Sequence, residues 1–161
     1  MRRHWSPNAD DRPSWCAVDT LILHYTGMPT AAAALARLRD PDAKVSAHYL
    51  IDEDGDVVHL VPEERRAWHA GVSSWAGRAR LNDCSIGIEL VNPGHEWGYR
   101  PFTDAQYDAC VELCRAILAR WPIAPRGVLA HSDVAPARKQ DPGELFDWAR
   151  LAAAGVGLWP Q

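Results

Sequence analysis

The chain has 161 residues, of which 47% are hydrophobic and 24% charged, with a formal net charge of -4 at pH 7. This length suits one compact domain with its own core, and the composition excludes a disordered or fibrous chain. The negative net charge argues against a nucleic-acid-binding protein, because neutralising phosphates requires a basic face.

The N-terminal residues 1–16 are polar and contain Pro7 and Pro13, which predicts an irregular arm ahead of a domain spanning residues 17–161. The first five residues lead into polar sequence and not into the hydrophobic core of a signal peptide. No apolar run approaches the roughly 18 residues needed to cross a bilayer. We therefore expect a cytoplasmic protein that has neither a membrane nor a nucleic acid as its partner.

The four cysteines, Cys16, Cys84, Cys110 and Cys114, form neither a C-x-x-C pair nor the dense framework of a small secreted domain. This pattern predicts reduced thiols. Cys110 and Cys114 are four residues apart on a predicted helix, so they share one of its faces and are expected to pack in the core.

Hydrophobic periodicity and turn signals predict strands alternating with helices. The helix beginning near residue 104 carries a capping box formed by Thr103 and Gln106, and an acidic turn at 52–55 joins two apolar runs as a hairpin. The expected strands are 18–24, 48–51, 57–61, 84–90 and 127–131, the expected helices are 30–38, 104–121 and 144–153, and a long loop covers 62–83. The predicted fold class is α/β, a single domain with a mixed central sheet of about five strands and helices packed against it.

Three predicted strands end on residues capable of chemistry: His24, Glu89 and His131. Ligands of open α/β sheets sit at strand ends. Asp141 follows His131 by ten residues, and two imidazoles plus a carboxylate form a ligand set that suits catalytic zinc. From spacing alone the signal is weak, because a histidine at a strand end is more often a hydrogen-bonded structural residue.

Five motifs occur together and in order, and they resemble the type 2 N-acetylmuramoyl-L-alanine amidases. This family includes AmpD and AmiD proteins, phage amidase lysozymes and peptidoglycan recognition proteins, and the match runs from about Trp15 to Pro160. The motifs are His24-Tyr25-Thr26, Ser46-Ala47-His48-Tyr49-Leu50-Ile51 with Asp54-Gly55, Ala67-Trp68-His69-Ala70-Gly71, Ser85-Ile86-Gly87-Ile88-Glu89-Leu90, and the segment from His131 to Gly143.

The resemblance implies a hydrolase that cuts the lactyl-amide bond between (anhydro-)N-acetylmuramic acid and the L-Ala of a peptidoglycan stem peptide. It implies a Zn²⁺ cofactor held by His24, His131 and Asp141. Glu89 is then the general base, which later protonates the leaving nitrogen, and Lys139 stabilises the oxyanion. The partner is a muropeptide or another peptidoglycan fragment.

Substrate-binding roles are expected for four residues of the long loop: Trp68, His69, Arg80 and Asn82. In AmpD-like relatives the residue matching Arg80 meets a carboxylate of the stem peptide, a target that suits a guanidinium fork. Asn82 is a candidate for recognising an amide, Trp68 for stacking, and His69 for lining the cleft. Like His48 and His59, His69 is also a competing candidate for the metal.

Other functions remain open at this stage. Recycling of anhydro-muropeptides, as in AmpD, is the expected setting. The Asn92-Pro93-Gly94 loop and the C-terminal residues look more like AmiD, whose members act on intact wall. A peptidoglycan-recognition module without catalysis and a glycosidase using Glu89 and Asp141 are the alternatives of other classes.

Overall fold

The structure is a computed structural model that describes residues 1–159. Its centre is a six-stranded sheet in the order β1-β5-β4-β9-β3-β10. Neighbouring strands β4, β9, β3 and β10 run parallel, β5 is antiparallel to β4, and β1 is parallel to β5. The strands are β1 (Arg2–Arg3), β3 (Thr20–Tyr25), β4 (Tyr49–Ile51), β5 (Val57–His59), β9 (Ser85–Leu90) and β10 (Val128–Ala130).

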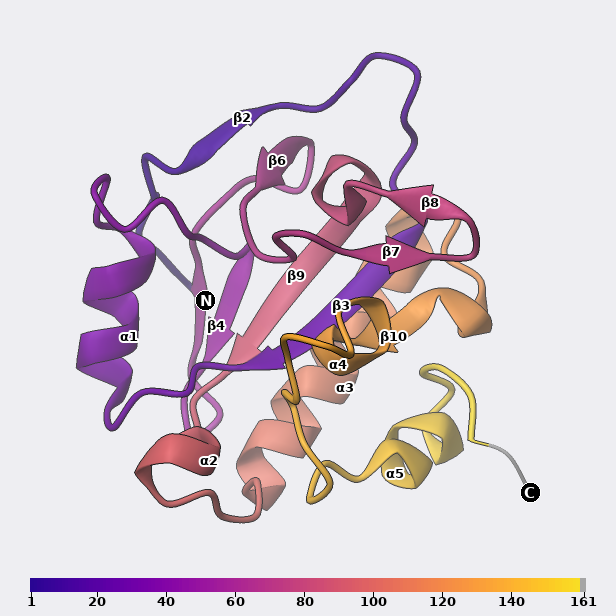
Figure 1. The fold of residues 1–161 in the computed structure, drawn as a ribbon. Coiled ribbons are helices and arrows are strands. Elements are labelled where there is room, and N and C mark those ends of the chain that lie inside the picture. The colour runs from indigo at the N-terminus through magenta and orange to yellow at the C-terminus, as the bar shows by residue number, and fades with distance from the viewer. Residues whose placement is uncertain (160–161) are drawn as a thin grey trace.

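Helices lie on both sides of this sheet, with the long α3 and the C-terminal α5 on one side and α1 beside β4 on the other (Figure 1). The helices are α1 (Ala31–Leu38), α2 (Gly94–Trp97), α3 (Asp104–Arg120), α4 (His131–Val134) and α5 (Trp148–Ala153), with short 3-10 turns at Leu81–Cys84 and Pro125–Gly127. None of the helices within residues 1–159 has the length and apolar character needed to cross a bilayer.

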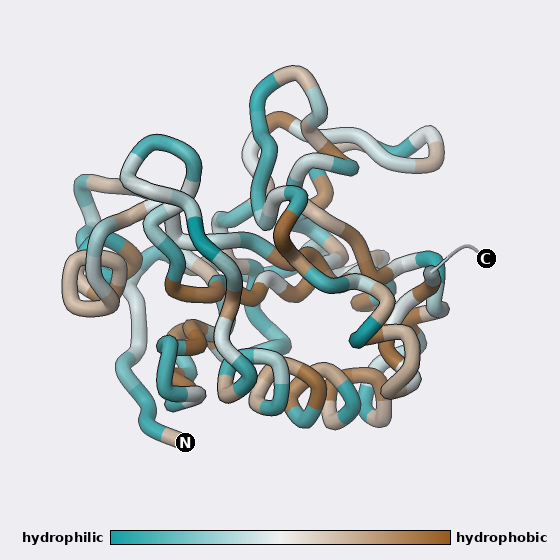
Figure 2. The backbone as a smooth tube through the Cα atoms, turned by 90° about the horizontal axis from the view of Figure 1, so that it is seen from below, coloured by the Kyte–Doolittle hydropathy of each residue, from teal (hydrophilic) through white to brown (hydrophobic). Residues whose placement is uncertain are grey.

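The two faces of the central strands carry different residues, because side chains alternate along a strand. Leu21, Leu23, Ile86 and Ile88 pack in the core with α3 and α5. Figure 2 shows hydrophobic segments gathered in the interior and hydrophilic loops outside them. The opposite face carries His24 on β3 and its register partner Glu89 on β9, so these two polar side chains share one side of the sheet.

The N-terminal residues are more regular than the sequence predicts. Arg2–Arg3 adds an edge strand to the central sheet, and β2 (Ala9–Asp11) pairs antiparallel with β6 (Arg65–Ala67). The expected irregular arm is therefore wrong in this respect, and β1 raises the strand number from about five to six. Two short strands, β7 (Ser74–Trp75) and β8 (Arg78–Ala79), form a hairpin in the long loop.

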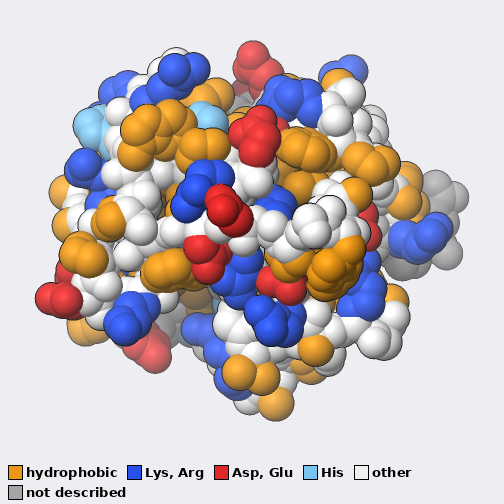
Figure 3. Space-filling view, turned by 90° about the horizontal axis from the view of Figure 1, so that it is seen from above, with side chains coloured by type: hydrophobic (Ala, Val, Ile, Leu, Met, Phe, Trp, Pro, Cys, Tyr) orange, Lys and Arg blue, Asp and Glu red, His pale blue; other side chains and the backbone are white. Residues whose placement is uncertain are grey.

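The face above the N-terminal arm and the long loop mixes Lys and Arg with Asp and Glu and shows no broad field of one sign (Figure 3). Between the two segments Arg65 pairs with Asp11 and Arg66 with Asp10, and Arg66 also pairs with Asp83 within the long loop. Opposite charges on adjacent segments thus account for the mixed surface.

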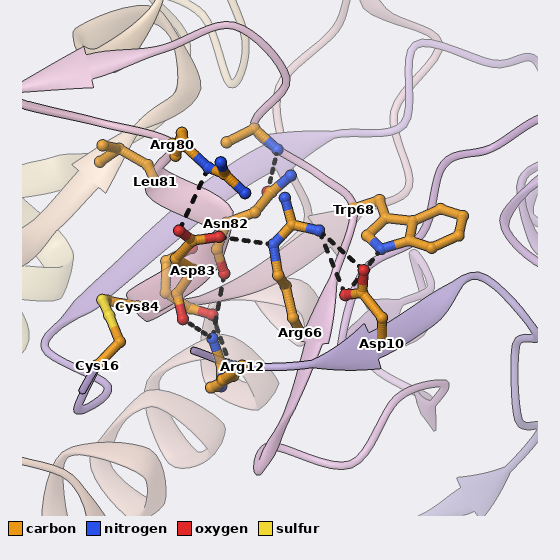
Figure 4. A network of polar contacts seen from close by, with 12 residues as sticks. Asp10, Arg12, Cys16, Arg66, Trp68, Arg80, Leu81, Asn82, Asp83 and Cys84 are labelled. Atoms are coloured by element: carbon orange, nitrogen blue, oxygen red, sulfur yellow. Dashed lines mark hydrogen bonds and ion pairs between the residues drawn. A yellow bond between two sulfur atoms is a disulfide. The ribbon is translucent and has the colours of Figure 1, made fainter. Parts of the chain in front are cut away.

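The expectation of four reduced thiols is wrong for two of them. Cys16 and Cys84 form a disulfide, with Cα atoms 5.7 Å apart, a separation typical of such bonds (Figure 4). The pair lies 68 residues apart in the sequence, so spacing gave no indication of it. Cys110 and Cys114 are free and buried in the core, as predicted.

The other predicted elements agree well with the structure. The hairpin around the acidic turn, the helix capped by Thr30 and the capping box of Thr103 and Gln106 are all present. The closing helix is shorter than expected, because its cap is Asp147, whose side chain accepts from the Arg150 amide. The last two residues of the predicted domain, 160 and 161, lie outside the described part of the chain.

Candidate metal centre and cleft

The parallel strands place three functional side chains together at one edge of the sheet. His24 on β3 is the register partner of Glu89 on β9, so the two side chains lie on the same face. Ala130, the last residue of β10, pairs with Leu23, and His131 follows it as the first residue of α4. The loop after α4 brings Asp141 back over this edge.

His24, His131 and Asp141 form a compact group that could hold a metal ion. The His24 Nδ1 and His131 Nδ1 atoms are 2.9 Å apart, and Asp141 Oδ2 is 3.2 Å from the first and 3.1 Å from the second. In a tetrahedral zinc site with bonds of about 2.0 to 2.1 Å, ligand atoms are separated by about 3.3 Å. The three atoms therefore have nearly the spacing of ligands around one small cation.

The chemistry of this donor set also fits a cation. All three side chains are buried, with 1% of His24 and 5% each of His131 and Asp141 exposed. Burial, together with the neighbouring His131, lowers the pKa of His24 to about 4, so the neutral ring is favoured. Burial opposes ionisation of Asp141, but its close contacts with His131 and His24 outweigh burial and hold its pKa below the usual range. A neutral His24 imidazole and an ionised carboxylate are protonation states that metal binding requires.

Glu89 lies beside this group and differs from it in having no partner. The residue is 8% exposed, and its Oε2 atom has no hydrogen-bond partner among the described residues. Burial, reinforced by the charge of Asp141, raises the pKa of Glu89 well above its usual value. A buried, unpaired carboxyl is costly to keep, and such groups are typical of functional sites.

A cleft of about 600 Å³ opens over these residues. Its walls come from α1 on one side and from the loop after α4 on the other, and its lining includes His24, His69, Glu89, His131, Asp141 and Lys139. Lys139 is exposed at the rim. The structure thus brings together the three predicted ligands and both predicted catalytic residues.

Three of the four residues predicted to bind substrate do not line this cleft. Arg80 forms an ion pair with Asp83 at 3.4 Å, and Trp68 donates its indole N–H to Asp10 (Figure 4). Asn82 is 8% exposed and accepts from the backbone amides of His69 and Ala70. Only His69 borders the cleft. Trp68 thus contacts the N-terminal arm, whereas Arg80 and Asn82 bond within the long loop, and the sequence carried no sign of these contacts.

The remaining candidate histidines are not part of the metal group. His48 is fully buried, its Nδ1 accepts from the Gly87 amide, and its Nε2 donates to the Arg65 carbonyl. His59 hydrogen bonds to the Val61 carbonyl. These contacts make His48 a packed residue that supports the backbone of β9 and β6.

The fold and this site define an α/β domain with a candidate divalent-metal centre at the carboxyl edge of its parallel strands. The family model described as N-acetylmuramoyl-L-alanine amidase, Amidase_2, matches residues 14–144. The chain belongs to this family, as its motifs indicated.

Individual relatives agree with this assignment. The chain is 44% identical to the N-acetylmuramoyl-L-alanine amidase AmiD of Escherichia coli strain K12 over 89% of its own length and 55% of that protein. It is 40% identical to the 1,6-anhydro-N-acetylmuramyl-L-alanine amidase AmpD of Enterobacter cloacae, over 92% and 86% of the two chains. The chain thus spans about half the length of that AmiD relative and most of that AmpD relative.

A solved structure extends the comparison to three dimensions. It is the complex of E. coli AmiD with anhydro-N-acetylmuramic acid-L-Ala-D-gamma-Glu-L-Lys. The TM-score is 0.83 at 41% identity, over 93% of this chain and 63% of the other. The predicted fold class is confirmed by this likeness.

Proposed function

We propose that the protein is a zinc-dependent N-acetylmuramoyl-L-alanine amidase, which hydrolyses the amide bond between the lactyl group of (anhydro-)N-acetylmuramic acid and the L-Ala of the stem peptide. The observation that carries the proposal is the convergence of His24 Nδ1, His131 Nδ1 and Asp141 Oδ2 on one point of a cleft. The AmpD and AmiD relatives are named as amidases, and the structure of E. coli AmiD was solved in complex with an anhydro-muramyl tripeptide.

His24, His131 and Asp141 would hold the zinc ion through those three atoms. Bound zinc lowers the pKa of water and polarises a carbonyl oxygen. Two histidines and a carboxylate leave a fourth ligand position open, as in catalytic rather than structural zinc sites.

The other steps fall to side chains of the chain itself. Glu89 takes a proton from the attacking water, and its unpaired Oε2 leaves it free to do so. It then gives that proton to the nitrogen of the departing L-Ala peptide. Lys139 at the rim offers an ammonium group to the oxyanion that develops on the carbonyl.

The substrate occupies the cleft between α1 and the loop after α4 in this proposal. Its volume of about 600 Å³ is sufficient for a muramyl peptide of a few residues. Substrate binding by Trp68, Arg80 and Asn82 stays a prediction. Their side chains bond to Asp10, to Asp83 and to the His69 amide, and none of the three lines the cleft.

We propose small anhydro-muropeptides as the preferred substrates, as in cytoplasmic recycling. This choice is supported by the similarity to AmpD, which extends over 86% of that relative's length. The Cys16–Cys84 disulfide favours a second candidate, an amidase that acts on intact wall in an oxidising compartment. Structural disulfides are rare in the reducing cytosol of most organisms.

The experiment is product analysis by mass spectrometry on anhydro-muramyl tripeptide and on intact sacculi, each with zinc and with chelator. Free peptide released only with zinc supports the amidase. Reducing sugar released in chelator would indicate the glycosidase instead, and zinc binding without cleavage would indicate a recognition module. Faster turnover of sacculi than of the tripeptide would favour the second candidate over recycling.

A further inference from the structure

One short segment, His69–Ala70, contacts both histidines of the metal group on the side away from the metal. The His24 Nε2 atom is 3.0 Å from His69 Nδ1, and His131 Nε2 is 3.0 Å from the Ala70 carbonyl oxygen. Both rings therefore have their Nδ1 atom in the metal group and their Nε2 atom against this segment.

The partner of His131 determines which of its nitrogens carries the proton. A carbonyl oxygen only accepts hydrogen bonds, so His131 Nε2 must donate to Ala70. The Nδ1 atom of the neutral ring is then left with its lone pair, and this atom faces Asp141 and His24. The carbonyl also accepts from Arg138 at 3.0 Å, which holds it in place.

The contacts of His24 continue through two further groups. His69 Nε2 lies 3.0 Å from the Ser85 hydroxyl. When His24 Nδ1 offers its lone pair to the metal, Nε2–H donates to His69 Nδ1, and His69 Nε2–H donates to Ser85 Oγ. With the protons placed in this way, each contact between His24, His69 and Ser85 has one donor and one acceptor.

The surrounding fold leaves His69 little freedom to move. The residue is 5% exposed, and a Cβ atom on Gly87 would lie 2.5 Å from its ring, so the absence of a side chain at this strand position is what admits the imidazole. The Asn82 side chain (Figure 4) accepts from the His69 amide at 3.1 Å and from the Ala70 amide at 2.8 Å. Strand β9 and Asn82 thus fix the segment that contacts both rings.

We propose that His69 is a positioning residue, which with Ser85 sets the tautomer and orientation of His24 for metal binding. This inference rests on the metal site of the proposed function and gives His69 a role other than substrate contact. Partners of this kind orient ligand rings and raise their basicity, and removing one typically weakens metal affinity about 10- to 100-fold.

The test is the zinc dissociation constant of the folded protein, measured by competition with a chromophoric chelator, together with KM at saturating zinc. Ser85 is fully buried and does not line the cleft, so its effect on zinc cannot arise from lost substrate contact. We expect Ser85→Ala and His69→Ala to weaken zinc binding about 10-fold or more, with KM changed by less than about 3-fold. Ser74→Ala, an exposed change in the β7–β8 hairpin, is the matched control.

A conservative variant separates positioning from a loss of folding. Asparagine at position 69 can place a carbonyl oxygen near the site of the histidine Nδ1, so His69→Asn should restore most of the zinc affinity that His69→Ala loses. Long-range nitrogen–proton NMR of the metal-free protein should show His24 protonated on Nε2 already before zinc is added. An Nδ1-protonated His24 would overturn the proposal.

Failure of the proposal can be told apart from failure of the proposed function. Zinc affinity unchanged in Ser85→Ala and His69→Ala, with KM raised in the latter, would make His69 a substrate-binding residue while the amidase stands. A wild-type protein that binds no zinc would instead remove the metal site on which both proposals depend.

Discussion

Two buried glutamates on different sides of the molecule have opposite surroundings. Glu89 in the cleft has an unpaired Oε2, and its pKa is raised by burial and by Asp141. Glu63 is 5% exposed and accepts from Tyr49, from Arg120 Nε and Nη2 and from the Trp121 indole. Burial opposes its ionisation, but these hydrogen bonds lower its pKa to about 2. A carboxyl that is fully bonded stabilises the fold, whereas one left unpaired is available for proton transfer.

The largest expected effect is that of Glu89→Gln on catalysis. Removing a general base typically costs about 10²- to 10⁴-fold in rate, and we expect kcat to fall by about 10³-fold. The free energy of unfolding should stay unchanged or rise, since a neutral amide replaces an unpaired carboxyl. Peptide release followed by chromatography and urea unfolding measure the two quantities. Near-normal turnover would show that Glu89 is not the base.

The Glu63→Gln change should have the reverse effect. Replacing a buried carboxylate that accepts several hydrogen bonds costs about 2 kcal/mol of unfolding free energy, less than in a fully buried ion pair because Arg120 is half exposed. The kcat of the folded enzyme should change by less than about 2-fold because Glu63 does not line the cleft. The exposed neighbour Glu64 provides the control, Glu64→Gln, with a stability change within about 0.5 kcal/mol. A large loss of kcat without loss of stability in Glu63→Gln would contradict the comparison.

Lys139 offers a smaller effect within the cleft. Since it is exposed at the rim, its ammonium is more hydrated than a buried donor, and we expect Lys139→Met to lower kcat about 10- to 100-fold. Lys44→Met, at another exposed position, should leave kcat unchanged. Equal kcat values for wild type and Lys139→Met would remove Lys139 from the catalytic set.

The smallest expected effect is the change with pH in the difference between the unfolding free energies of wild type and Glu63→Gln. The folded-state pKa of Glu63 lies below its usual value of 4.5, so its stabilisation is fully present above about pH 4.5 and is lost as pH falls toward 2. The stability gap between wild type and Glu63→Gln, measured by urea unfolding, should therefore narrow over this interval. A gap that stays constant from pH 5 to pH 2.5 would show that Glu63 titrates normally.

Local sequence signals predicted most of the fold, because they depend on neighbouring residues. The alternation of β9, the Thr103–Gln106 capping box and the acidic hairpin turn are all of this kind. The metal group came from resemblance, since spacing alone left the three ligands ambiguous. The Cys16–Cys84 bond and the placement of Trp68 depend on contacts of the N-terminal arm with residues 62–84. No periodicity records such contacts, so the sequence did not indicate them.

Ser85 shows the same limit at the site itself. It is buried at the start of β9, and its role becomes visible through the contact of its hydroxyl with His69, sixteen residues away. A serine in an apolar strand could equally have been a neutral packing residue. Gly87 likewise becomes informative only when the His69 ring is seen beside it.

The most direct test of the central claim is zinc-titrated cleavage of anhydro-muramyl tripeptide by metal-free wild-type protein and by Asp141→Ala, with products identified by mass spectrometry. We predict that wild-type protein releases free tripeptide in proportion to zinc up to one equivalent, and that Asp141→Ala neither binds that equivalent tightly nor cleaves. Release of tripeptide by the metal-free wild type, or undiminished zinc-dependent cleavage by Asp141→Ala, would contradict the assignment of the amidase centre to His24, His131 and Asp141.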